Sequence, residues 1–406
     1  MTIKELSTDH TLIINQIELS IKFYKWDSIL SFLPEGSFLV GGYIRDIILG
    51  RLANDVDVDI VVPSNSINIG KIISDNLKGK FIVLDEQRGV VRVILKQISI
   101  DIANQAASSI QGDLETRDFS INAVAYLFHK KCLIDPLDGI KDIKISLLRT
   151  YSKRNIVDDP LRILRCFRFV SELNFNIDKK LVYYIKQYKR KLNLVANERI
   201  NYEINRIIRG SNAIDSVLLI KKFNIFGIEK FCQDSFLIDL REINYEDLNA
   251  NEKQKFLPLF FLGQILDIIS LEKLKYSKTE ITHLKLLQKW NLTLRKINIS
   301  QLTELARFEL HKELEEILPA FVFYLPENIR LDWLKRWRDK NDKLFHPSNL
   351  LNGESIKKHL NINDGPFLGK LIYYLSKELA FDRLNNFDEA IYKAKQWIEQ
   401  NAPKCD

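Results

Sequence analysis

The hydrophobic pattern of the chain changes once, near residue 150, and this change limits the folds that it can adopt. Before about residue 145, β-branched and alternating runs predict strands at 38–40, 56–62, 80–84, 90–95 and 98–102. Beyond about residue 155, apolar residues recur at spacings of three and four, as in Leu161, Leu164 and Phe167, and strand-like alternation disappears. The sequence therefore predicts an α+β head that is followed by an all-α remainder.

The length of 406 residues exceeds what one hydrophobic core usually organises, so we expect several domains. We place a head at 1–150, a helical neck at 151–212, a helical body at 213–345 and a helical tail at 346–406. Helix breaks are predicted at five prolines of the helical part: Pro258, Pro319, Pro326, Pro347 and Pro366.

The longest apolar stretch, Phe256 to Ile269, contains Pro258, Gly263 and Asp267 and is shorter than the roughly 20 residues of a membrane-spanning helix. The N-terminal sequence MTIKELSTDH lacks the basic end and apolar run of a signal peptide. We therefore expect a cytoplasmic protein without a membrane partner. The net charge of +7 is compatible with a polyanionic partner, but it also suits many proteins that bind no nucleic acid.

The segment FLVGGYIRD (38–46) predicts a strand, a Gly-Gly turn and the start of a helix. Backbone N–H groups at such a turn bind phosphate well. Gly41 and Gly42 are therefore candidate nucleotide-binding residues, and Arg45 is a candidate phosphate contact one helical turn further on. Asp46 is expected to anchor the turn. A glycine pair alone is a weak signal, because tight turns need glycine whatever they bind.

Three aspartates alternate at the start of the next predicted strand. Side chains at i and i+2 of a strand point to the same side, about 7 Å apart, so Asp55, Asp57 and Asp59 are expected on one face. Clustered carboxylates repel each other unless cations neutralise them, and Mg²⁺ favours carboxylate and phosphate ligands. The pattern predicts a catalytic Mg²⁺ site. The alternative is a solvated acidic face on an edge strand, but the apolar run at 60–62 favours a buried strand.

These motifs and several further ones resemble a known family. LVGGYIRD (39–46), ILGR (48–51) and the Asp-x-Asp pair look like the head signature of class II tRNA nucleotidyltransferases (CCA-adding enzymes) and of their bacterial poly(A) polymerase relatives. The similarity continues through TRDFSINAVAY (116–126), IDPLDGIKDI (134–143), DDPLRILRCFRF (158–169), ERINYEI (198–204) and LLNGESIKKHLNINDGPFLGKLI (350–372). Only about 230 to 345 shows no such motif.

The resemblance implies a nucleotidyltransferase head with a polymerase-β-like mixed sheet, Mg²⁺ as cofactor, CTP and ATP as substrates, and the tRNA 3′ end as RNA partner. It leaves open whether the chain adds CCA, only CC or only A. Poly(A) tailing is the alternative activity, because the same motifs occur there. A catalytically silent RNA-binding protein on the same scaffold is disfavoured by the intact aspartates. The tail is expected to contact tRNA, and no protein partner is predicted.

The resemblance allows two registers for the metal-binding pair. The spacing after Gly-Arg selects Asp55 and Asp57, whereas the apolar run after the second aspartate selects Asp57 and Asp59. We prefer Asp57 and Asp59, because a two-residue insertion in a turn is easily accommodated. Asp101 in the strand ISIDIA is a candidate third catalytic carboxylate, either completing the site or acting as general base, and an ordinary strand-end acid is the alternative.

Arg117 is a candidate for triphosphate or ribose contact. The family commonly has a second arginine where this chain has Thr116, which weakens any expectation of a doubled charge. Asp118 and Asn122 are expected to hold local structure.

In DDPLRILRCFRF, Pro160 suits a helix start, and Arg162, Arg165 and Arg168 form a drifting basic stripe that is a candidate for nucleotide binding. In the family, an Asp and an Arg of the matching motif hydrogen-bond the base of the incoming nucleotide, and Asp159 and Arg162 hold those positions here. A carboxylate beside a fork of donors can read the amino and carbonyl groups of cytosine, and a small reorientation reads adenine. An exposed helix face with ion pairs is the alternative.

Overall fold

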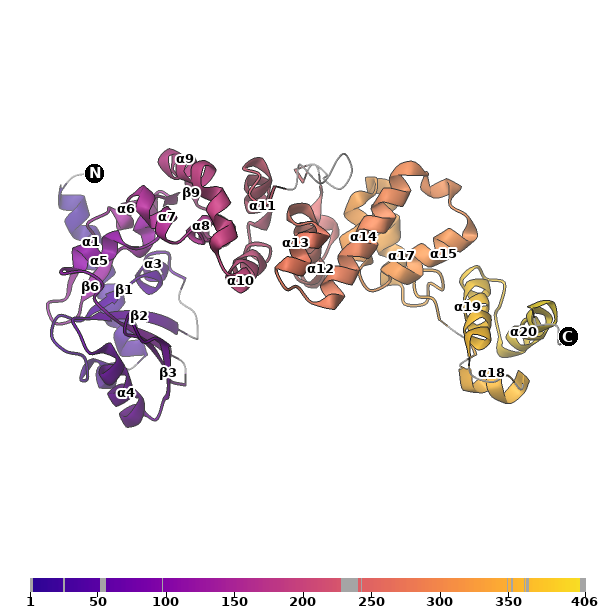
Figure 1. Ribbon diagram of the computed structural model, residues 1–406, viewed down its shortest axis with the longest axis horizontal. Coiled ribbons are helices and arrows are strands. Elements are labelled where there is room, and N and C mark those ends of the chain that lie inside the picture. Colours follow the sequence, from indigo (N-terminus) through magenta and orange to yellow (C-terminus); the bar gives the residue numbers. More distant parts are fainter. Residues whose placement is uncertain are drawn as a thin grey trace. The chain divides into compact units, whose positions relative to one another are not determined.

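The computed structural model describes residues 3–24, 26–51, 56–96, 98–227, 240–241, 243–348, 350–351, 353–360, 362 and 365–401. The chain divides into two compact units, Met1–Ser216 and Val217–Asp406 (Figure 1). Among the described residues, strands occur only in the first unit, and the fold is 60% helical. This confirms the predicted fold class, a mixed-sheet head with a helical remainder. The unit boundary lies near the expected neck–body junction, and the four-part division stays a prediction.

A seven-stranded mixed sheet forms the centre of the first unit, with the order β3-β4-β5-β2-β1-β6-β7. The strands span, in that order, Lys80–Asp85, Val90–Ile94, Ile98–Asn104, Val56–Val62, Phe38–Val40, Ala125–Leu127 and Cys132–Ile134. β2 pairs in parallel with β5 and antiparallel with β1, and the other neighbouring pairs are antiparallel. β2 is therefore an interior strand and not the edge strand of the alternative interpretation.

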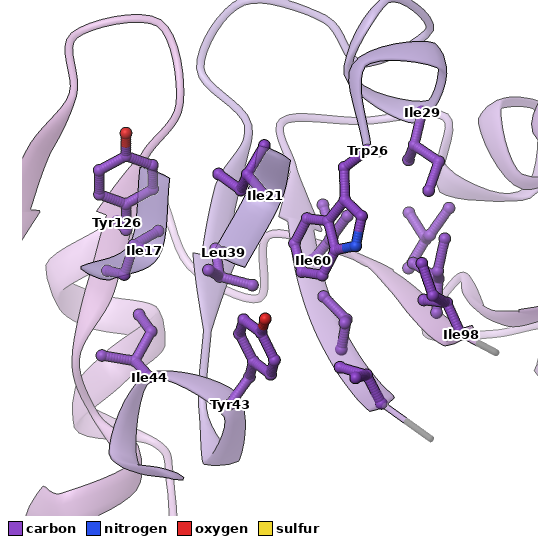
Figure 2. Packing of buried hydrophobic residues seen from close by; sticks show 14 of the residues in the cluster. Ile17, Ile21, Trp26, Ile29, Leu39, Tyr43, Ile44, Ile60, Ile98 and Tyr126 are labelled. Atoms are coloured by element: carbon purple, nitrogen blue, oxygen red, sulfur yellow. The ribbon is translucent and has the colours of Figure 1, made fainter. Parts of the chain in front are cut away.

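One face of the sheet is covered by three helices, α1 (Ile3–Phe23), α3 (Gly42–Ile48) and α4 (Ser66–Leu77), with the short α2 (Asp27–Leu30) beside them. Figure 2 shows Tyr43 and Ile44 of α3 packed against Leu39 of β1. Ile44 and Leu39 are fully buried. Truncating such a side chain to alanine costs about 2–5 kcal/mol, so this core fixes α3 and the turn that precedes it relative to β1.

The other face of the sheet packs on α5 (Ile110–Glu115) through a smaller apolar cluster that includes Val40, Val61 and Leu114. The 3₁₀ turn η1 (Ser120–Asn122) follows and contacts α3. Next come α6 (Gly139–Lys144) and the two-residue strand β8 (Leu147–Leu148). β1 is thus packed on both faces, which explains why its three residues are all buried.

The rest of the first unit is helical: α7 (Lys153–Asp158), α8 (Arg162–Leu173), α9 (Lys179–Tyr188), η2 (Lys189–Leu194), α10 (Asn197–Ile207) and the start of α11 (Ala213–Lys222). One departure from the all-α expectation is β9 (Asn176–Ile177), which pairs in parallel with β8. Two residues are too few to produce an alternation in the sequence. α8 meets the chain after α10 closely, since a Cβ at Gly210 would lie 2.1 Å from Oγ of Ser171.

The second unit contains helices alone among its described residues. They are η4 (Tyr245–Asp247), α12 (Ala250–Ile265), α13 (Ile268–Lys273), α14 (Lys278–Lys296), η5 (Ile299–Gln301), α15 (Glu304–Leu314), α16 (Leu318–Phe321), η6 (Val322–Tyr324), α17 (Glu327–Arg338), α18 (Gly353–Leu360), α19 (Pro366–Ala380) and α20 (Phe387–Asn401). The last three share an apolar core around Leu371 and Ile356. No helix in the described ranges is long and apolar enough to cross a membrane.

The prediction that Pro258 breaks a helix is wrong, because Pro258 lies inside α12. Proline removes one backbone hydrogen bond and crowds the preceding turn. Here the neighbouring Phe256, Phe260, Phe261 and Leu262 are all buried, so packing favours the continuous helix. Pro319 and Pro366 do stand at helix starts, and Pro326 immediately precedes α17.

Candidate active site

The Gly-Gly turn after β1 requires glycine at its first position. Gly41 has φ +81°, a conformation that side chains disfavour. A Cβ at this position would lie 2.6 Å from Oδ2 of Asp59, because Val40 and Asp59 are directly opposite in the β1–β2 register. The turn therefore brings bare backbone against the carboxylate of β2, and Gly42 opens α3 immediately afterwards.

Asp57 and Asp59 are exposed and alternate with the buried residues of β2, which places both carboxylates on one side of the strand. Within the described part of the chain, neither carboxylate makes a hydrogen bond or an ion pair. Asp101 of β5 lies opposite Asp59 in register but accepts two hydrogen bonds from Arg92 of β4, at 2.7 and 2.8 Å. Asp55 lies outside the described residues. The structure thus separates two unpaired carboxylates from a third that is already neutralised.

The environment of Asp59 holds excess negative charge. Asp59 reaches solvent, yet protein atoms fill most of the volume around its carboxylate, and this desolvation raises its pKa. Asp101 and Asp57 raise the pKa further, while Arg117 and Arg165 oppose the shift. Hard oxygen donors with unbalanced charge fit a divalent cation that also binds substrate phosphates. Within the described ranges, no three His, Cys, Asp or Glu side chains form a metal-binding group. Mg²⁺ commonly completes its coordination with water and substrate phosphates.

Arg117 lies at the Gly-Gly turn. Its Nη1 would be 3.2 Å from a Cβ at Gly41, and its Nη2 is 3.5 Å from Oδ2 of Asp113. Its buried Nε has no partner among the described residues. The backbone carbonyl of Arg117 accepts a hydrogen bond from Nδ2 of Asn155, at 2.6 Å. A cation is therefore held beside the turn and the unpaired carboxylates, where a triphosphate needs one.

Arg45 does not project freely toward the turn. It donates to both carboxylate oxygens of Asp46, each at 3.0 Å, and to Oδ1 of Asn122 at 2.7 Å. Nδ2 of Asn122 donates in turn to Asp118, at 2.9 Å. The expectation that Asp46 anchors the turn agrees with this geometry, whereas direct phosphate contact by Arg45 would require breaking an existing pair.

Asp118 connects the head to the neck. Both Nε and Nη2 of Arg165 donate to its Oδ2, at 2.8 and 2.6 Å. Burial alone would raise the pKa of Asp118, but Arg165, Asn122 and the backbone N–H of Phe119 outweigh it and hold the pKa well below its usual range. Asp118 of the head thus orients Arg165 of the neck helix α8.

Arg168 is not brought to the same site. It is buried, its Nη1 lies 3.2 Å from Oε1 of Glu203, and its guanidinium packs 4.7 Å from the centre of the Phe169 ring. Three residues of helix turn about 300°, so each step of three displaces a side chain by about 60° around the axis. Two steps carry Arg168 away from the direction of Arg162 and into the interior.

Asp159 and Arg162 lie at the start of the neck helix. Asp159 is non-helical, and its Oδ2 accepts a hydrogen bond from Nη2 of Arg199 at 3.0 Å. Arg162 is half-buried and donates through Nη1 to the carbonyl of Asn155, at 3.1 Å. Burial lowers the pKa of Arg162, with Arg165 adding to this and Asp118 and Asp159 opposing it. The Arg162 guanidinium, which uses only part of its donors, therefore lies near the Asp159 carboxylate. Recognition of a base edge needs such a combination of donors and an acceptor.

Sequence reasoning missed three residues of this site. Nδ2 of Asn155 donates to the carbonyls of Glu115 and Arg117, and the backbone carbonyl of Asn155 accepts from Nη1 of Arg162. The capping-box motif that begins at Ser152 is a signal for Asn155, because Asn155 stands three residues after this N-cap, at position N3. Arg92 gave no local signal, because it meets Asp101 on the next strand, nine residues later. Arg199 lies in the motif ERINYEI, but its contact with Asp159, 40 residues earlier, could not be read from the sequence.

Two family models match the chain in the regions of the candidate site and of the neck. The model described as "Poly A polymerase head domain" matches residues 37–149. A second model, described as "Probable RNA and SrmB- binding site of polymerase A", matches residues 174–228. The first match contains the Gly-Gly turn and the aspartates of β2, and the second contains α10.

Similar proteins extend over nearly the whole chain. A CC-adding tRNA nucleotidyltransferase of Synechocystis is 28% identical over 403 residues, covering 90% of this chain and 95% of the relative. A CCA-adding enzyme of Ligilactobacillus salivarius is 26% identical over 93% of this chain and 98% of its own length. The solved Thermotoga maritima CCA-adding enzyme with tRNA has the same fold, with a TM-score of 0.70 at 22% identity over 89% of this chain and 91% of that chain. The two family matches and these relatives together support the family of class II CCA-adding tRNA nucleotidyltransferases and poly(A) polymerases for this chain.

Proposed function

We propose that this protein adds nucleotides from CTP and/or ATP to the 3′ end of tRNA. The observation that carries the proposal is that Asp57 and Asp59, neither of them ion-paired within the described residues, lie on one side of β2, with Asp59 against Gly41. This strand belongs to a head that matches the polymerase family model. Relatives named CC-, A- and CCA-adding tRNA nucleotidyltransferases support the tRNA substrate. Poly(A) tailing is the rival activity of the same family.

The family requires a divalent metal ion, and we assign it as Mg²⁺ held by Asp57 and Asp59. Bound there, Mg²⁺ would lower the pKa of the RNA 3′-hydroxyl and balance charge on the phosphate under attack. The register Asp55–Asp57 is the alternative pair. Asp101 is assigned a supporting role, because both of its oxygens are engaged by Arg92.

The reaction is an in-line attack of the RNA 3′-hydroxyl oxygen on the α-phosphorus, with cleavage of the bond to the leaving pyrophosphate. Backbone at Gly41 and Gly42, together with the Arg117 guanidinium, would hold the triphosphate. Arg165, oriented by Asp118, would place the neck helix so that Asp159 and Arg162 reach the base. Asp159 accepts from the amino group of cytosine, and Arg162 donates to its ring nitrogen and carbonyl. The rate then comes mainly from positioning and electrostatics.

The extent of addition is the finer part of the proposal. CC-adding relatives match at 28% identity over 403 residues and, for a Geobacter sulfurreducens enzyme, at 36% over 194 residues. We therefore propose that this chain incorporates C twice and uses ATP poorly. Because it acts on tRNA, we also place it in the cytoplasm.

The test uses tRNA ending in the discriminator base, in C or in CC, each with CTP or ATP alone, followed by sequencing of the products. Two added C residues with CTP, and little product from tRNA ending in CC with ATP, support CC addition. Efficient A addition to tRNA ending in CC would replace it by CCA addition. Long A tails on unrelated RNA would overturn the tRNA assignment. Asp57→Ala should abolish all incorporation, and retained activity would contradict the catalytic assignment.

A further inference from the structure

The exposed face of α10 carries a row of arginines around a tyrosine. Arg199, Tyr202 and Arg206 follow at steps of three and four, which places them along one side of the helix, and Arg209 continues the row just beyond its end. The Tyr202 ring is 58% exposed. Nη1 of Arg209 donates to Oδ1 of Asn205, at 3.2 Å, which holds Arg209 on this side. We name Arg199, Tyr202, Arg206 and Arg209 the α10 face.

The end of the α10 face is hollowed. A depression of about 290 Å³ is lined by Glu172, Tyr202, Asn205, Arg206, Arg209 and Gly210. The Arg206 guanidinium lies 5.9 Å from the centre of the Tyr202 ring. An exposed ring beside guanidinium groups is the arrangement on which an unpaired base stacks while phosphates meet the charges.

The charge of this surface is not balanced by its carboxylates. Arg199 pairs with Asp159 and Arg206 with Glu172, at 3.0 and 2.8 Å. Arg209 makes no ion pair with any described residue. Arg51 of the head joins the same region, since its Nη1 donates to the backbone carbonyl of Glu172, at 2.8 Å. With the exposed Glu198 of α10 counted, four guanidinium groups stand against three carboxylates, which leaves a net positive charge for an anionic partner.

The row begins beside Asp159 and extends away from it, which indicates that its ligand is a polynucleotide strand and not a free nucleotide. The row begins at Arg199, which contacts Asp159, and Arg206 is seven residues or about 10 Å further along the helix. Its other end, at Glu172, is tied to Arg51, six residues before Asp57. The row therefore continues about 10 Å beyond the residue that contacts Asp159, and a polynucleotide that ends at the catalytic strand can follow it.

We propose that the α10 face, with Arg51, binds the sugar–phosphate backbone of the tRNA strand that leads to the reacting 3′-hydroxyl, with one base stacked on Tyr202. The inference rests on the proposed function and deepens it. The matched family model describes RNA binding for the whole region 174–228. What is new is the assignment to one helix face, to the backbone, and to a stacking tyrosine.

The charge contribution is tested with Arg206→Gln/Arg209→Gln, which removes two charges from exposed positions outside the catalytic residues. Lys71→Gln/Lys130→Gln is the matched control, because it removes two exposed charges from the head. Both variants and the wild type are assayed for KM of tRNA, KM of CTP and the salt dependence of kcat/KM. The slope of log(kcat/KM) for tRNA against log[salt] should become shallower by about 1.4–1.8 in the α10 variant, since each phosphate contact contributes about 0.7–0.9. KM for tRNA should rise about tenfold, with KM for CTP within about twofold, and the control should match the wild type.

Tyr202 is tested by binding of fluorescently labelled tRNA in the absence of CTP. Tyr202→Ala should weaken binding by about fivefold or more without changing the salt slope, and Tyr202→Phe should bind as the wild type does, because it keeps the ring. An unchanged slope and KM for tRNA in the arginine variant would overturn the proposal, as would a rise confined to KM for CTP. If the wild type adds no nucleotide to any tRNA, the proposed function fails, while the binding measurements still decide whether this face holds RNA.

Discussion

The carboxylates of the candidate site differ from two glutamates of the second unit in their partners. In the first unit, Asp57 and Asp59 are exposed, next to each other and unpaired within the described residues, and the pKa of Asp59 is raised. In the second unit, Glu252 lies 2.6 Å from Arg338, and Glu378 contacts both Arg383 and Lys393. These pairs hold the pKa values of both glutamates below their usual range.

The difference separates function from stability. A paired carboxylate with a lowered pKa stabilises the folded state at neutral pH, whereas crowded, unpaired carboxylates destabilise it until a ligand balances them. The ion pairs of Glu252 and Glu378 therefore contribute to the stability of the second unit. In the head, the negative charge at Asp57 and Asp59 is not balanced by an ion pair within the described residues. Changes to the two kinds of carboxylate should then have opposite consequences for stability and activity.

Asp118 lies in the first unit and, like Asp101, is paired in the way of the two glutamates of the second unit. Asp118→Asn should lower the free energy of unfolding by about 3–5 kcal/mol, since it leaves Arg165 without its buried counter-charge. It should also reduce kcat/KM for CTP by about 100-fold, because the Arg165–Asp118 contact no longer positions α8 against the head. Urea unfolding and steady-state kinetics check both. Exposed Asp215→Asn is the control with the same charge change, and an Asp118→Asn protein as stable as that control would contradict this role.

His311 gives the second unit an acid sensitivity that does not depend on its carboxylates. Burial among Trp333 and Phe345, helped by Arg336 and Arg307, lowers the pKa of His311 to about 3. Between about pH 6.5 and 3 the unfolded chain therefore binds a proton that the folded chain excludes, so stability falls as the pH falls. About 2 kcal/mol should be lost between pH 6.5 and 5, at about 1.4 kcal/mol for each pH unit.

Thermal unfolding across this range measures the loss, and His311→Phe should remove most of it while keeping an aromatic ring in the cluster. If His311→Phe and the wild type lose stability equally between pH 6.5 and 5, His311 is not the responsible group.

Glu252→Gln should show the smaller cost of breaking a partly exposed pair. Arg338 is 41% exposed and can be hydrated when its partner loses charge, so the expected loss is about 1–2 kcal/mol. Turnover of the folded enzyme should change by less than about twofold, because Glu252 lies in the second unit, outside the candidate site. A calorimetric melting curve and a kcat measurement on one preparation check both, and a large fall in kcat at unchanged stability would place Glu252 in the catalytic machinery.

Local patterns predicted five of the seven strands of the central sheet and the placement of Asp57 and Asp59 on one face, but not the three-residue strands β6 and β7. Alternation in β2 and the neighbouring Gly-Gly turn depend on residues a few positions apart, so the sequence contains their cause. Pairings across the fold could not be read in this way. Arg45 is engaged by Asn122, 77 residues later, and Arg168 by Glu203, 35 residues later. The prediction for Pro258 failed for the same reason, because buried neighbours outweigh a local helix breaker.

The most direct test of the central claim compares Asp59→Asn with Glu252→Gln, using thermal unfolding and incorporation of labelled CTP into tRNA. Asp59→Asn should lose at least about a thousandfold in incorporation while its melting temperature stays the same or rises, because an unfavourable charge is removed. Glu252→Gln should lose melting temperature and keep its activity. An Asp59→Asn protein that still transfers nucleotides, or that is destabilised as much as Glu252→Gln, would contradict the account.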